Sequence, residues 1–338
     1  MFTPVCRLIG HGSDVVRGRI SPDLSTISTC SADKSLYVWD PTTGESIRAF
    51  YGHSKELTDL VYHGSGSGIF TSSVDGHVRL FDLRSSSPGA SLTFPGTTVH
   101  AEYADEYTCL TAGNGANSSL LLAGTSGGYL KFFDARKGSE VISTFAHYNT
   151  VCSLETSPND SMVTSSSLDG TIRIWSASHG DCLMTVNEGT SNPAPCVYSG
   201  FSADCEGFIG LFLDSTVRRW SLRDRIASQG KATGPKMTSS TKTFTRTSGF
   251  GGIAVPSEDG YVHFLDFMSG KPTQAPTKAH CDDVLSVDCR DNLLISTGAG
   301  EDSSCVIWAR LSEADSSFVK TDYNLSFNLV SPQIEGLI

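Results

Sequence analysis

The chain has 338 residues, of which 18% are charged and 33 are glycine, and its formal net charge is −11. Few charges and many glycines favour short strands joined by tight turns over long surface helices. The acidic balance and the lack of any lysine and arginine run argue against direct binding to nucleic acid, because phosphate backbones attract basic surfaces.

The first residues, Met1 to Arg7, lack the basic and long apolar regions of a secretion signal. No apolar stretch along the chain is long enough to cross a bilayer. We therefore expect a soluble, intracellular protein without a membrane partner.

One pattern recurs along the chain, and it is clearest from Asp169-Gly170 to Trp175: a turn dipeptide, alternating residues and a final large side chain. The large residue recurs at Trp39, Phe81, Phe133, Trp175, Trp220, Leu265 and Trp308, at intervals of 42, 52, 42, 45, 45 and 43 residues. Such a period matches one four-stranded propeller blade. The sequence therefore predicts an all-β, seven-bladed propeller over residues 1–311.

Two further positions keep a constant distance from this anchor residue. Six residues before it, all repeats but the third (Gly127) carry an aspartate: Asp33, Asp75, Asp169, Asp214, Asp259 and Asp302. Twenty-eight residues before it, four repeats carry a small residue followed by histidine: Gly10-His11, Gly52-His53, Ala146-His147 and Ala279-His280.

These residues closely resemble the repeats of WD-repeat proteins. The resemblance implies that the turn aspartate accepts a hydrogen bond from the histidine, which in turn bonds a strand serine or threonine, which bonds the tryptophan N–H. The residues expected in this network are His11, Ser31, Asp33 and Trp39; His53, Ser73 and Asp75; His147, Ser167, Asp169 and Trp175; and His280, Asp302 and Trp308. Because the fifth repeat lacks the histidine, we expect Asp214→Ala to cost less stability than Asp169→Ala.

The same residue types could suggest a hydrolytic triad, but a triad needs one site and not a repeated one. The sequence contains no G-x-S-x-G, P-loop or H-E-x-x-H motif. Its ten cysteines stand without a C-x-x-C pair, which favours free, mostly buried thiols over a metal site. We expect no enzyme, no metal and no cofactor.

Four segments lie outside the repeat. Phe2 to Leu8 is expected to close the ring by pairing with the strand that carries Val306 to Trp308. The third repeat has an insertion (Pro88 to Glu106 and Gly113 to Ser118), and Gln229 to Thr247 contains a mild cationic cluster (Lys231, Lys236, Lys242 and Arg246). Residues 312–338 form an apolar C-terminal tail, predicted to dock on another surface.

Three features distinguish this chain within the WD-repeat class: the segment from Ser165 to Trp175, Asn192-Pro193 in place of the fifth glycine–histidine pair, and the inserted Glu301-Asp302. In these features the chain resembles the small WD-repeat subunit of SET-domain histone methyltransferase complexes. That family holds an arginine side chain between two phenylalanines at the channel mouth.

Carried over to this chain, one phenylalanine is Phe244, whereas the second position is Leu110, with Tyr107 as the nearest aromatic residue. The other channel positions are Ala32, Thr58, Cys152 and Tyr198, and Val74 replaces an acidic residue. The resemblance thus implies a non-catalytic scaffold that binds peptides with basic residues, with the nucleus favoured over the cytoplasm as its location. An assembly subunit of an RNA-processing, signalling or trafficking complex, using other propeller faces, is the alternative.

Overall fold

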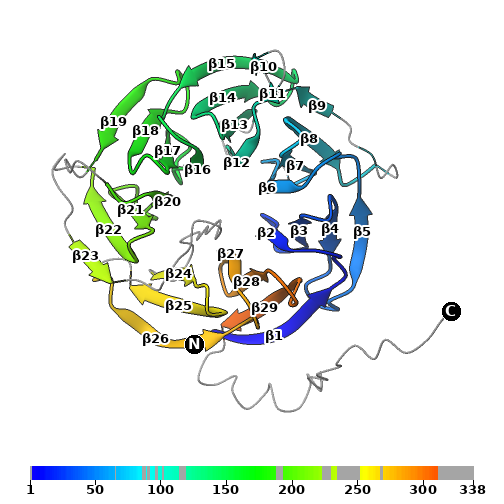
Figure 1. Cartoon of the computed structure of the whole chain (residues 1–338). Helices are drawn as coiled ribbons and strands as arrows, with labels where there is room; N and C mark the ends of the chain where they lie inside the picture. Colours follow the sequence, from blue (N-terminus) through cyan, green and yellow to red (C-terminus); the bar gives the residue numbers. More distant parts are fainter. Residues whose placement is uncertain are drawn as a thin grey trace.

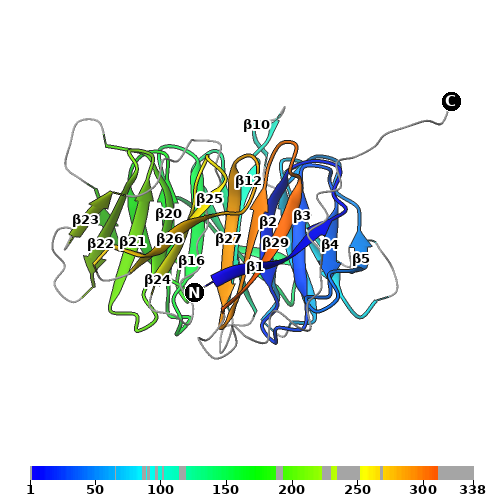
Figure 2. The same cartoon turned by 90° about the horizontal axis from the view of Figure 1, so that it is seen from below.

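The computed structural model describes residues 2–310, except 65, 86–88, 90–91, 96–97, 101–102, 114–118, 188–192, 223–229, 234–251 and 267–268. Among these residues every regular element is a β-strand, and seven antiparallel sheets stand around a central axis (Figure 1). The predicted seven-bladed propeller is confirmed. Seen from the side, the strands cross the ring from one face to the other (Figure 2).

The blades are numbered in chain order from their inner strands. Blade one is β2 (Val15–Ile20), β3 (Ile27–Ser31), β4 (Leu36–Trp39) and β5 (Ser46–Phe50). Blade two is β6 (Leu57–Tyr62), β7 (Gly68–Ser73), β8 (His77–Asp82) and β9 (Leu92–Pro95). Blade three is β12 (Tyr107–Ala112), β13 (Leu120–Thr125), β14 (Tyr129–Asp134) and β15 (Ser139–Phe145). Blade four is β16 (Val151–Thr156), β17 (Met162–Ser167), β18 (Ile172–Ser176) and β19 (Cys182–Val186).

Blade five is β20 (Cys196–Phe201), β21 (Gly207–Phe212), β22 (Thr216–Ser221) and β23 (Gly230–Thr233). Blade six has three strands within the described residues: β24 (Gly252–Pro256), β25 (Tyr261–Asp266) and β26 (Pro272–Lys278). Blade seven is β27 (Val284–Arg290), β28 (Leu293–Gly298), β29 (Ser304–Arg310) and β1 (Phe2–Ile9). Part of the insertion in the third repeat forms a separate hairpin of β10 (Thr98–His100) and β11 (Tyr103–Ala104).

Blade seven is assembled from both ends of the described chain. Strand β1 pairs antiparallel with β29, from Phe2 opposite Arg310 to Ile9 opposite Ser304. The Phe2 ring also stacks on Phe264 of blade six, with ring centroids 5.7 Å apart. A propeller has no free seam when its first strand completes its last blade, so β1 closes the ring.

The core lies between neighbouring blades. In the seam between blades four and five, Ile174 packs with Phe208 and Trp220, and all three are at least nine-tenths buried. Inner strands such as β20 are buried along their whole length, whereas outer strands such as β15 are largely exposed. This gradient explains why apolar residues concentrate in the inner strands.

Several expectations can be compared directly with the described residues. All ten cysteines are free: five are buried, three are half-buried, and Cys182 and Cys281 are exposed. The part of the chain with assigned structure contains no helix long and apolar enough to cross a bilayer. The tail from 312 onward, Phe244, Lys236, Lys242 and Arg246 lie outside the described residues.

Candidate functional site

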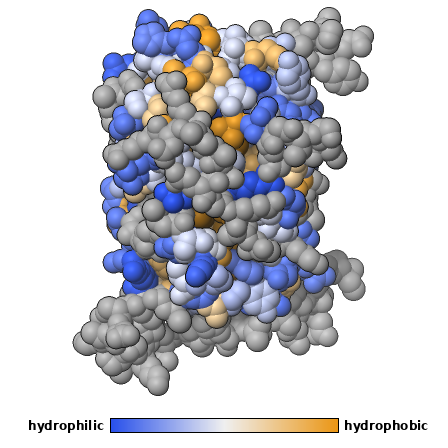
Figure 3. Space-filling view, turned by 90° about the vertical axis from the view of Figure 1, so that its left-hand side faces the viewer, coloured by the Kyte–Doolittle hydropathy of each residue, from blue (hydrophilic) through white to orange (hydrophobic). Residues whose placement is uncertain are grey.

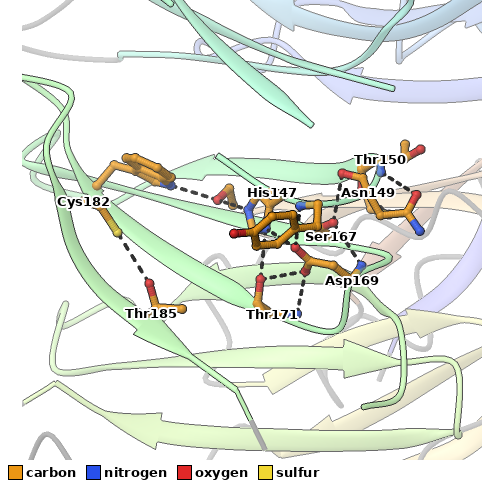
Figure 4. A network of polar contacts seen from close by, with 12 residues as sticks. His147, Asn149, Thr150, Ser167, Asp169, Thr171, Cys182 and Thr185 are labelled. Atoms are coloured by element: carbon orange, nitrogen blue, oxygen red, sulfur yellow. Dashed lines mark hydrogen bonds and ion pairs between the residues drawn. The ribbon is translucent and has the colours of Figure 1, made fainter. Parts of the chain in front are cut away.

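The loop before each inner strand defines one face of the ring, which we call the histidine-loop face because it carries His11, His53, His147 and His280. Blade four shows the network beneath it (Figure 4). His147 Nδ1 lies 3.2 Å from Asp169 Oδ2, and His147 Nε2 lies 2.7 Å from Ser165 Oγ. Trp175 Nε1 donates to the same Ser165 Oγ at 2.9 Å. The turn, the loop and two strands are thereby joined in one buried chain of hydrogen bonds.

The hydroxyl between histidine and tryptophan belongs to a different residue from the one expected. Thr29, Ser165 and Ser296 occupy that place, and Thr71 contacts His53 in the same way in blade two, where Phe81 replaces the tryptophan. The expected Ser31, Ser73 and Ser167 lie two residues further on, where Ser167 accepts from Asp169 N at 3.1 Å and donates to Asn149 O at 3.2 Å. Residues two apart on a strand share a face, so the hydroxyl pattern alone could not separate the two positions.

In blade seven the network includes the closing strand. Both His280 Nε2 and Trp308 Nε1 lie 3.0 Å from Ser296 Oγ, and His280 Nδ1 lies 3.3 Å from Asp302 Oδ2. Arg7 of β1 donates to the other carboxylate oxygen of Asp302 and, at 2.9 Å, to Ala279 O. Asp302 therefore connects the histidine network with ring closure.

Blade three replaces the network with other groups. Asp105 stands at the histidine position and accepts hydrogen bonds from Gly127 N at 3.0 Å and Ser126 Oγ at 3.1 Å. Lys131 is 1% exposed, and its Nζ lies 5.3 Å from the centre of the Tyr107 ring. Blade three is thus stabilised by the Asp105 carboxylate and the Lys131 cation, where other blades use a hydrogen-bonded histidine–aspartate pair.

Blade five corrects the expectation for Asp214. Arg218, which is 2% exposed, donates from Nη2 to Asp214 Oδ2 at 2.5 Å. Its guanidinium carbon lies 4.0 Å from the centre of the Phe212 ring. Because Asp214→Ala would remove the carboxylate partner of a buried cation, we no longer expect this change to cost less than Asp169→Ala.

The turn aspartates are held in their ionised form. Burial alone would raise the pKa of Asp33, Asp75, Asp169 and Asp302, but hydrogen bonds from the histidines and from neighbouring N–H and O–H groups outweigh it. The pKa of each carboxyl therefore lies well below its ordinary value. A carboxylate that accepts several hydrogen bonds favours its charged form.

A second set of polar groups lines the inner strands, and sequence reasoning missed it. Asp59 Oδ2 accepts from Leu110 N of the next blade at 2.9 Å, and Arg17 Nε lies 3.2 Å from Asp59 Oδ1. Asp288 of blade seven likewise accepts from Ile20 N of blade one at 2.9 Å and lies 3.3 Å from Arg19 Nη1. An aspartate in the middle of a predicted inner strand was the signal that could have identified these residues.

Most of the residues expected to bind a peptide are not available to one. Thr58, Tyr107, Leu110 and Tyr198 are 3%, 0%, 0% and 2% exposed. Thr58 Oγ1 donates to Tyr107 O at 2.8 Å, and Tyr198 Oη donates to the Glu155 carboxylate.

The described structure therefore does not bring these side chains together as an arginine clamp, because strand alternation turns them into the core or onto the next blade. Ala32 and Cys152 are half-buried. Val74, which donates from N to Glu56 O at 3.1 Å, is half-buried as well.

The histidine-loop face is acidic where blades seven and one meet. Asp14 Oδ1 accepts from Gly300 N of blade seven at 2.8 Å, and Asp282 Oδ2 accepts from Glu301 N at 3.0 Å. Burial, followed by the charges of Asp282 and Asp14, raises the pKa of Asp283. These carboxylates repel one another, so an added cation would be stabilised here.

Comparison with known proteins agrees with this geometry. The model of the WD domain, G-beta repeat, matches residues 2–40, 44–82 and 139–176. The chain is 25% identical over 219 residues to Periodic tryptophan protein 2 homolog of Dictyostelium discoideum. This match covers 64% of this chain and 22% of that protein.

It is 28% identical over 193 residues to WD repeat-containing protein 82 of Drosophila melanogaster, covering 56% of this chain and 58% of that protein. It is 31% identical over 194 residues to the Guanine nucleotide-binding protein subunit beta of Oryza sativa subsp. japonica, covering 54% and 47%. The chain therefore spans between about a fifth and three fifths of the length of these relatives.

Fold and network together define a closed ring whose histidines, aspartates and hydroxyls stabilise its own blades. The fold is that of a seven-bladed WD-repeat β-propeller, and three of its repeats match the WD-repeat model.

Proposed function

We propose that this propeller is a non-catalytic scaffold subunit of a multisubunit complex and binds an arginine- or lysine-bearing segment of a partner on its histidine-loop face. The observation that carries the proposal is the acidic group of Asp14, Asp282 and Asp283, in which the pKa of Asp283 is raised by burial and then by the charges of its two neighbours. A guanidinium placed there would lower this repulsion and gain charge-assisted hydrogen bonds.

We further propose that the complex is a histone methyltransferase complex in the nucleus. Support comes from the sequence features shared with that family, Asn192-Pro193 and Glu301-Asp302. Phe244 is the aromatic residue retained from the family's arginine clamp. If it stacks on arginine, Phe244→Ala weakens an arginine-bearing histone-tail peptide by about 1–2 kcal/mol.

A signalling complex is the second candidate. It is supported by the match to a protein named as a guanine nucleotide-binding protein subunit, at 31% identity. Many unrelated functions use one propeller fold, so partner identity has to be measured.

Affinity purification of the full chain from its native cells, with quantitative mass spectrometry, separates the candidates. The methyltransferase proposal expects SET-domain subunits in stoichiometric amounts. Recovery of guanine nucleotide-binding subunits instead, without SET-domain proteins, would replace the first candidate with the second. Recovery of the chain as a free monomer would contradict the scaffold itself.

A further inference from the structure

The outer strand of every blade is a sheet edge, and exposed edges can pair with other chains unless charge or proline protects them. Four of the five outer strands whose side chains are all described carry such a residue: Pro4 and Arg7 in β1, Arg48 in β5, Glu140 in β15, and Pro272, Pro276 and Lys278 in β26. The exception is β19, whose sequence is CLMTV. Blade four therefore has an edge without this protection.

An apolar groove lies beside that edge. Its volume is about 590 Å³, and it is lined by Met162, Ile174, Leu183, Met184, Cys205, Glu206 and Leu222 of blades four and five. Leu183 is 57% exposed. Figure 3 faces the side of the ring on which β19 and β22 lie, and apolar surface appears there between hydrophilic patches. Flexible methionines let such a groove adapt to different side chains.

Two other seams are closed by a side chain at the equivalent position. Arg48 is the equivalent of Met184 in blade one, because it pairs with Val38 as Met184 pairs with Ile174. The Arg48 side chain reaches the next blade, where it donates to Leu83 O at 3.1 Å and also to Ser85 O. In blade three the equivalent residue is Ile142. It lies so close to Gly180 of blade four that a Cβ on this glycine would be 3.1 Å from Ile142 Cδ1. Met184 carries no group that could make the bridge of Arg48.

The charges near the groove are mainly acidic. Asp181, next to β19, and Asp204 are exposed, Glu206 forms part of the lining, and the charge of Arg219 in β22 acts on Asp204. Cys205 and Glu206 lie in the turn between β20 and β21, on the face opposite the histidine loops. A ligand seated here would leave the histidine-loop face free.

We propose that β19 and this groove bind an extended segment of a partner protein by strand addition. The segment pairs its backbone with the free edge of β19, places apolar side chains at alternate positions in the groove, and carries a basic residue next to Asp204 and Glu206. Strand addition obtains affinity from main-chain hydrogen bonds and specificity from alternate side chains. This second surface goes beyond the proposed function, because it needs no ligand on the histidine-loop face.

The probe is a displayed library of random 12-residue peptides, selected on the full chain and counter-selected on the Leu183→Lys/Met184→Lys variant. Ile47→Lys on β5, where Ile47 is 58% exposed, is the matched control. Equal melting temperatures of the three proteins establish that the variants fold. We expect the selected peptides to carry apolar residues at alternate positions with flanking lysine or arginine. Their affinity for the double variant should be at least tenfold lower than for the wild type, and their affinity for the control variant should be unchanged.

Hydrogen exchange of the full chain then reports on the pairing itself. Bound peptide should slow exchange of amides in β19 and not in β5, an effect that side-chain contact alone would not produce. The proposal is wrong if no peptide depends on Leu183 and Met184, if the selected peptides show helical spacing, or if β19 exchange does not change. A peptide of residues 319–331 tests whether the chain's own tail is the ligand instead, because Tyr323, Leu325, Phe327 and Leu329 stand at alternate positions in it. If this peptide binds more tightly than any selected peptide, a partner segment is not the ligand of the groove.

Discussion

Arg7, on the strand that begins the chain, donates a hydrogen bond to the carboxylate of Asp302 in the last blade. Asp302 Oδ2 also lies 3.3 Å from His280 Nδ1. One side chain thus belongs both to the closure of the ring and to the network that holds the last blade.

Breaking this contact should weaken closure. In a double-mutant cycle of Arg7→Met and Asp302→Asn, we expect a coupling free energy of about 1–2 kcal/mol, because the pair is charge-assisted but the Arg7 side chain is 35% exposed. Urea unfolding measures it. The matched cycle of Arg7→Met with Asp169→Asn, in blade four, should give no coupling; equal values in both cycles would refute a closing role.

The hydroxyl between histidine and tryptophan offers a second test. Thr29→Val leaves both His11 Nε2 and Trp39 Nε1 without their hydroxyl partner, whereas Thr71→Val affects only His53, because the Phe81 side chain has no N–H group. We expect losses of about 2–4 and 1–2 kcal/mol in the free energy of unfolding, respectively. Thermal or urea melts measure both, and the reverse order would contradict the network.

Stability should fall in acid. Because the folded pKa of Asp75 lies below its ordinary value of 3.8, its contribution is complete above about pH 4 and is lost as the pH falls toward the folded pKa. One such carboxyl contributes at most about 1.4 kcal/mol per pH unit.

Asp75→Asn should therefore be less stable at pH 7 and depend less on pH between 4 and 2. Urea unfolding at several pH values checks this, with Glu45→Gln, at an exposed position, as the control. If the free energy of unfolding of Asp75→Asn depends on pH as strongly as that of the wild type, Asp75 does not cause the loss of stability in acid.

Lys34 has left-handed backbone at a position where four other blades have glycine: Gly76, Gly128, Gly170 and Gly260. Its φ is 71°, and the equivalent Gly170 has φ 80°. Because left-handed backbone costs a side-chain-bearing residue energy that glycine avoids, Lys34→Gly should stabilise by about 0.5–1 kcal/mol. Gly170→Lys should destabilise by more, since its Cβ would lie 2.7 Å from Pro193 Cβ. Calorimetric melts of both variants decide; a loss of stability in Lys34→Gly would contradict the strain.

The repeat could be predicted because its spacing is local: turn aspartate, anchor and histidine keep constant distances along the chain. Thr29 and Ser165 could not be chosen over Ser31 and Ser167, since both members of each pair lie on the same strand face. The Arg218–Asp214 pair and the Asp59–Leu110 contact depend on side-chain direction and on blade packing, which the repeat spacing does not contain. Side-chain direction also explains why the sequence predicted Tyr107 and Tyr198 at a binding surface, although both are buried.

The most direct test of the scaffold is a calorimetric titration of the full chain with an arginine-bearing histone-tail peptide. The proposed function predicts saturable binding that weakens as salt rises. The Asp282→Asn/Asp283→Asn variant should bind at least threefold more weakly, and Glu45→Gln, in the turn between β4 and β5 on the opposite face, should bind as the wild type does. Absence of saturable binding, or equal loss in both variants, would contradict a basic-segment site on the histidine-loop face.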